Sequence, residues 1–186
     1  MALSERILKR VVQLGGAHGV ADLEMEAAIR GLNFPAPLLG GDEVDDAISQ
    51  EDATLWLTVE PEQFFKSIPR GFKPFFFRTF ENHYFKPFTE GSSDQGAWGD
   101  LNEEYFRQQV TGPTLEFIEI GCWEGGYPDL FYVCLSDPDP SNPQVYATDS
   151  DCSWETIKQE GQLLAFLDRF QTPSQLRATL QRITVN

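Results

Sequence analysis

Cysteine and histidine are scarce in this chain of 186 residues, and no long apolar run occurs. The three cysteines include no Cys-x-x-Cys pair, which excludes a disulfide framework and favours a reducing compartment. The three cysteines and the two histidines match no zinc signature, so we expect no metal. No run approaches the roughly 18 apolar residues of a membrane span, and no apolar stretch follows the first basic residues as in a signal peptide. We therefore expect a cytoplasmic protein without membrane insertion.

Basic residues are also few, with 14 Lys and Arg against 29 Asp and Glu, which gives a formal net charge of −15. This charge repels phosphate backbones and anionic lipid, so nucleic acid is not expected as a partner. It favours encounter with a basic protein or with a cationic segment of a membrane protein. Solubility alone is the other explanation of such acidity, and the oligomeric state stays open.

Apolar spacing divides the chain into helical ends and a strand-rich middle. Helices are predicted over residues 3–14, 22–30, 100–110, 163–170 and 172–183, and strands over 54–59, 114–120, 129–135 and 144–148. Strands in the middle without strand-helix alternation predict an α+β fold, with a central, mostly antiparallel sheet flanked by N-terminal and C-terminal helices. We interpret the chain as a single domain, made of a helical part (1–53), a sheet-forming part (54–148) and C-terminal helices (149–186).

Residues 63–88 form a basic aromatic segment within the acidic chain and contain nine of its 15 phenylalanines. One interpretation places alternate rings such as Phe75 and Phe77 in the core of a sheet. A second makes the surplus rings part of a protein-binding surface, and a third lets them stack on nucleic-acid bases. The net charge argues against the third, and the role of the segment stays open.

Cys122 is the candidate nucleophile of an alternative in which the chain is an enzyme. It falls in a glycine-flanked stretch that predicts a turn over residues 121–128, where His83 or an acid could activate an exposed thiol. Unactivated cysteines more often act as small buried hydrophobes. The loop GCWEGGYPD also lacks the lysine and the glycine spacing of phosphate-binding loops. We therefore expect no enzymatic activity, no catalytic residue and no cofactor.

A pattern runs through residues 114–171 from a Gly-containing turn through an aspartate and an apolar strand to a short Val-Tyr strand and a closing helix. It is carried by Gly121, Gly126, Asp129, Val145, Tyr146 and the stretch from Leu164 to Leu167. In these residues the segment resembles the SUKH superfamily. The resemblance implies a non-catalytic α+β binding domain. The family includes bacterial immunity proteins that neutralise toxins, cell-wall-assembly regulators of yeast, and Syd proteins that contact the Sec translocon.

Acidic residues gather in the stretch that carries this resemblance, with ten acids and one base between Glu116 and Glu160. We expect an acidic protein-binding module, most concretely an immunity protein that neutralises a basic toxin domain, with a secretion chaperone or translocon-associated factor as the alternative. The predicted partner-binding acids are Asp129, Asp137, Asp139, Asp149 and Asp151, on turns expected to be exposed. Tyr127 and Trp123 are predicted aromatic anchors, although Trp123 could equally be packed beneath its turn.

Overall fold

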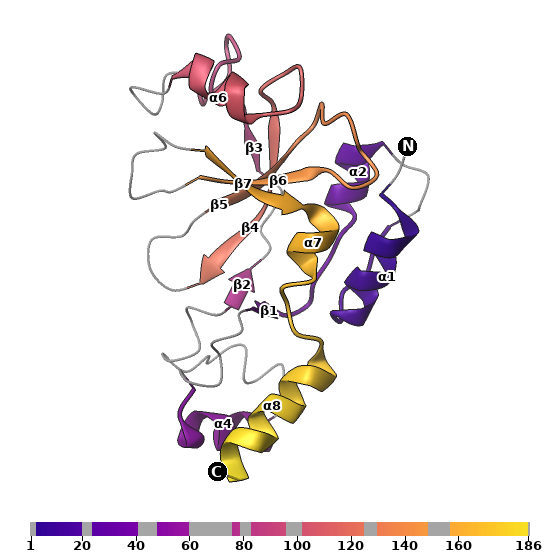
Figure 1. The fold of residues 1–186 in the computed structure, drawn as a ribbon, viewed down its shortest axis with the longest axis vertical. Coiled ribbons are helices and arrows are strands. Elements are labelled where there is room, and N and C mark those ends of the chain that lie inside the picture. Colours follow the sequence, from indigo (N-terminus) through magenta and orange to yellow (C-terminus); the bar gives the residue numbers. More distant parts are fainter. Residues whose placement is uncertain are drawn as a thin grey trace.

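The fold is built on a seven-stranded antiparallel sheet, seen in a computed structural model (Figure 1). The structure describes residues 3–19, 24–40, 48–59, 76–78, 83–95, 102–124, 130–148 and 157–185. The strands are β1 (Leu38–Leu39), β2 (Phe76–Arg78), β3 (Tyr84–Phe85), β4 (Phe117–Glu124), β5 (Leu130–Cys134), β6 (Gln144–Thr148) and β7 (Ile157–Gln162). Their order is β1-β2-β4-β5-β6-β7, and β3 also pairs with β4. Helices at both ends of the chain complete an α+β fold, as predicted.

Three helices cover one face of the sheet. They are α1 (Glu5–Gln13), α2 (Met25–Arg30) and α7 (Leu163–Leu167), which Figure 1 shows on the same side of the strands. The predicted apolar face of the first helix is confirmed, because Leu3, Ile7, Val11 and Leu14 are all buried. These side chains join the largest core cluster, to which the strands contribute Ile118, Phe131, Val133 and Val145.

The other face of the sheet is covered by α6 (Glu103–Gln109), which begins at the N-cap Asn102, whose side chain accepts a hydrogen bond from the Tyr105 backbone N–H. Phe106 on this helix is fully buried in the same core cluster as Phe85, from the basic aromatic segment. Phe77, from the same segment, is buried on the opposite face, as predicted, whereas Phe75 lies outside the described residues. The described rings of this segment therefore contribute to the hydrophobic cores on both faces of the sheet.

The predicted strand at residues 54–59 is wrong, because this stretch belongs to the helix α4 (Gln50–Thr58). Short apolar runs do not distinguish a strand from a helix, and the local capping chemistry decides here. The Ser49 side chain accepts a hydrogen bond from the Asp52 backbone N–H, and two acids occupy the first turn. Trp56 and Leu57 then pack in a third core cluster with Leu180 of α8 (Pro173–Val185).

One strand boundary and one additional strand also differ from the predictions. The turn expected from residue 121 is still strand, because β4 continues to Glu124 after a bulge between Glu119 and Gly121. The part expected to hold only C-terminal helices contains β7, which pairs with β6. This strand shows a mostly exposed pattern after Ile157, so it lacks the apolar alternation that predicts a strand. The start of α8 is confirmed, since the Thr172 side chain accepts a hydrogen bond from the Gln175 backbone N–H.

The helices in the described part of the chain are all too short or too polar to cross a bilayer.

Candidate functional site

Four of the predicted partner-binding residues lie outside the described residues. They are Tyr127, Asp129, Asp149 and Asp151. Their part in partner recognition therefore stays a prediction, and the described part of the site consists of Trp123, Asp137 and Asp139.

Trp123 is half-buried in the first core cluster, on the same sheet face as α7. Its ring centroid lies 5.8 Å from those of Phe77 and Phe170 and 6.2 Å from that of Phe131. Trp123 was predicted either as an anchor for a partner or as a ring packed within the fold, and the structure packs most of the ring against the core. Any contact of Trp123 with a partner is limited to the part of the indole that this packing leaves exposed.

Asp137 is only 9% exposed, which differs from the expectation that the acids of its turn are exposed. Its carboxylate accepts hydrogen bonds from the backbone N–H groups of Asp139 at 2.8 Å and Gln144 at 3.0 Å, and from the Thr111 hydroxyl at 3.3 Å. These bonds tie both ends of the proline-rich turn together. The carboxylate is thus bound within the fold and is not exposed to a partner.

Asp139 is the exposed acid of the same turn. Its Oδ1 atom accepts a 2.6 Å hydrogen bond from the Ser141 hydroxyl, and it makes no ion pair with any residue that the structure describes. Other acids of this stretch are paired, since Glu116 contacts Lys86 at 3.3 Å and Glu160 contacts Arg169 at 2.7 Å. Among the described acids of the stretch, Asp139 is therefore the best placed to meet a cationic partner.

Glu119 is a buried acid whose burial the sequence analysis did not predict. It lies on β4 opposite Tyr132 of β5, on the face that α6 covers, and is 6% exposed. Desolvation raises the pKa of its carboxyl to about 7. Burial and, to a smaller extent, the charge of Glu119 also raise the pKa of the Tyr132 hydroxyl. The signal was present, because Glu119 follows Phe117 by two residues and a strand places such residues on one face.

Cys122 lies in β4 rather than in a turn, and it is 5% exposed. His18 and His83 are both exposed. The exposed, glycine-flanked position that favoured Cys122 as a nucleophile is therefore not found. Within the described residues, no three His, Cys, Asp or Glu side chains gather into a possible metal site.

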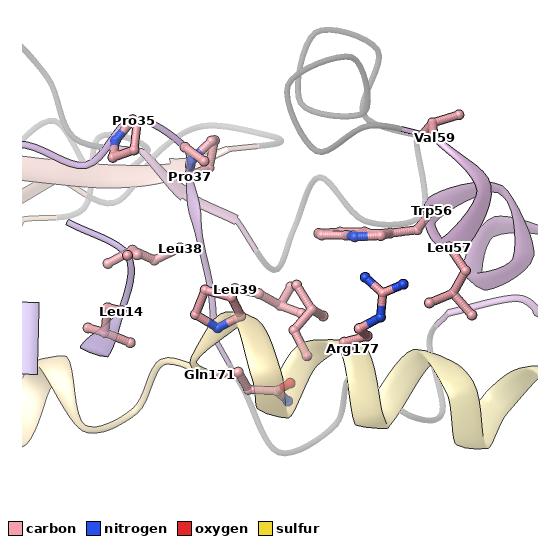
Figure 2. A pocket seen from close by; sticks show the side chains of 14 residues that line it. Leu14, Pro35, Pro37, Leu38, Leu39, Trp56, Leu57, Val59, Gln171 and Arg177 are labelled. Carbon is pink, nitrogen blue, oxygen red and sulfur yellow. The ribbon is translucent and has the colours of Figure 1, made fainter. Parts of the chain in front are cut away.

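A cavity of about 380 Å³ lies where α4, α8 and β1 meet (Figure 2). Its walls are mainly apolar and include Leu14, Pro35, Pro37, Leu39, Trp56, Leu57 and Leu176. Arg177 is the one charged residue among the described residues that line it, and Gln171 adds an amide. The sequence analysis missed this cavity because its walls come from four separate stretches of the chain, one of them with a wrongly predicted strand.

No protein-family model, no curated protein sequence and no solved structure matches this chain.

Proposed function

We propose that this chain is an acidic protein-binding module that recognises a basic protein, most concretely an immunity protein that covers a basic toxin domain. The observation that carries the proposal is the formal net charge of −15. A field of this sign speeds the encounter with a cationic partner and slows the encounter with nucleic acid or anionic lipid. The more specific choice of an immunity protein rests on the resemblance of residues 114–171 to the SUKH superfamily.

Exposed acids without a cationic neighbour support this proposal, because their negative charge is not offset locally. Four arginines each contact one carboxylate, in the pairs Arg10–Asp168, Arg30–Glu26, Arg107–Glu103 and Arg169–Glu160. Six exposed acids make no ion pair with the described residues: Glu5, Glu24, Glu51, Glu90, Glu104 and Asp139. Their negative charge stays available to a partner.

The test begins with the protein encoded by the neighbouring gene, because immunity proteins are expected beside their toxins. We expect its expression to arrest growth, co-expression of this chain to restore growth, and the two purified proteins to form a complex. Association should slow as salt rises, since screening weakens steering by exposed charge. Lysozyme, a basic protein of unrelated surface, serves as the control for non-specific attraction. Absence of rescue and of a complex would overturn the immunity proposal.

A further inference from the structure

The cavity between α4, α8 and β1 combines an apolar wall with a single charge whose sign is opposite to that of the whole protein. Prolines and leucines from residues 35–39 form one wall, and Trp56 and Leu57 of α4 form another. No Asp or Glu is among the described lining residues, although acids outnumber bases in the chain by 29 to 14. Locally, the cavity therefore favours an anion over a cation.

Arg177 supplies this charge. Figure 2 shows its side chain extending from α8 toward the Trp56 ring. Arg177 is exposed, and within the described part of the chain it makes neither an ion pair nor a hydrogen bond. Arg10 and Arg107 each contact a carboxylate of this acidic protein, whereas the guanidinium of Arg177 meets no carboxylate of a described residue. A guanidinium offers a planar set of donors that matches a carboxylate.

Gln171 adds a second polar group. Its backbone N–H donates to the Leu39 carbonyl at 2.8 Å, which fixes the residue against β1. Its side-chain Oε1 atom is buried and accepts no hydrogen bond from any residue that the structure describes. A buried acceptor without a donor is unfavourable, so once the Gln171 side chain turns toward the cavity, a ligand with a hydroxyl or an amide N–H gains a hydrogen bond to this atom and removes the penalty.

We propose that this cavity binds an amphipathic organic acid, a monocarboxylate whose apolar body lies against the Leu39 and Trp56 walls and whose carboxylate meets Arg177. A hydroxyl or amide N–H on the same molecule donates to the Gln171 amide oxygen. The cavity volume of about 380 Å³ is near the lower end of ligand pockets, which suits a compact, medium-chain acid.

The direct test is calorimetric titration of the full chain with octanoate below its micellar concentration. Two ligands of equal chain length, methyl octanoate and octylammonium, report on charge. The proposal expects one octanoate per chain, with methyl octanoate bound about tenfold more weakly and octylammonium more weakly still. Equal binding of all three ligands, or no binding of octanoate at millimolar concentration, would overturn it.

Matched variants locate the site. Arg177→Gln should weaken octanoate binding about tenfold and leave methyl octanoate unchanged. Arg6→Gln is the control, because it removes the same charge from an exposed position on α1 that does not line the cavity. Unchanged octanoate binding by Arg177→Gln, or an equal loss in Arg6→Gln, would contradict the assignment to this cavity.

The role of Gln171 is separated from that of Arg177 by a ligand with a donor group. With 3-hydroxyoctanoate, the parent should bind more tightly than with octanoate, and Gln171→Met should abolish this advantage while keeping octanoate affinity. Thermal unfolding of each variant shows that it folds. If Gln171→Met leaves the preference for the hydroxy acid intact, the amide oxygen does not recognise the donor.

Discussion

Trp123 occupies space that only a glycine at position 40 leaves free. A Cβ atom placed on Gly40 would lie 2.7 Å from Cη2 of Trp123 and 3.1 Å from Cδ1 of Phe170. Real Cβ atoms essentially never come as close as the first of these distances. Gly40 is thus packed directly against the indole, and the ring cannot shift without disturbing Phe77 and Phe131.

Gly40→Ala should therefore destabilise the protein by about 1 to 3 kcal/mol, because the added methyl group overpacks a closed aromatic cluster. Chemical denaturation measures the loss. Gly19→Ala is the matched control, since its Cβ would meet its nearest neighbour at an ordinary 3.7 Å. Equal stability of the two variants would show that the aromatic cluster accommodates the added methyl group, which would contradict the prediction.

Glu119→Gln should change how stability depends on pH. The folded-state pKa of about 7 is raised above the ordinary 4.5, so the stability contributed by the protonated carboxyl is fully present below pH 4.5. It is lost as the pH rises through about 7. Each pKa unit corresponds to about 1.4 kcal/mol of stability. At pH 8 the free energy of unfolding of the variant should therefore exceed that of the parent by roughly 3 kcal/mol. Near pH 4.5 the two should be similar.

Denaturation of the parent and Glu119→Gln across this pH range gives the comparison, with the exposed Glu104→Gln as the control for the lost charge. A constant difference between parent and Glu119→Gln from pH 4.5 to pH 8 would contradict the buried, proton-binding role of Glu119.

The sequence predicted the elements whose periodicity is strong. The buried face of α1, the strands β5 and β6, and the Thr172 cap of α8 all follow patterns set by nearby residues. The prediction of a strand at residues 54–59 was wrong because the apolar pattern of this short stretch is equally compatible with a helix. Packing against α8 stabilises the helix. β7 has polar residues at most positions and is specified by pairing with β6, a long-range contact.

The candidate sites were predicted less completely than the fold. A surface acid and a buried acid have the same letter in a sequence, so the engagement of Asp137 and the burial of Glu119 depend on which segments cover them. Asp137 accepts hydrogen bonds from Thr111, which is distant in the sequence, and from Gln144, which is nearby. Only the fold shows that both residues reach this carboxylate.

Asp137→Ala should lower stability by about 2 kcal/mol, because it leaves the Asp139 and Gln144 backbone N–H groups without their carboxylate acceptor. The loss should appear as a lower midpoint of chemical denaturation. Asp139→Ala removes an exposed acid from the same turn and should cost less. The opposite ranking of the two variants would refute the structural role of Asp137.

Cys122→Ala should leave partner binding intact and reduce stability by about 1 kcal/mol, as expected for a small change at a buried strand position. Growth rescue and denaturation, measured on the same variant, separate the two effects. Complete loss of rescue by a variant with parental stability would instead favour an enzyme that uses the thiol.

The most direct test of the proposed function is the association rate between this chain and its basic partner, measured by stopped flow over a series of salt concentrations. The comparison uses the parent and a variant that carries Asp139→Lys, Asp149→Lys and Asp151→Lys. If acidic residues steer the encounter, the variant should associate more slowly at low salt, and the difference should fade as salt screens the charges. Parental association rates in the variant at every salt concentration would contradict the account.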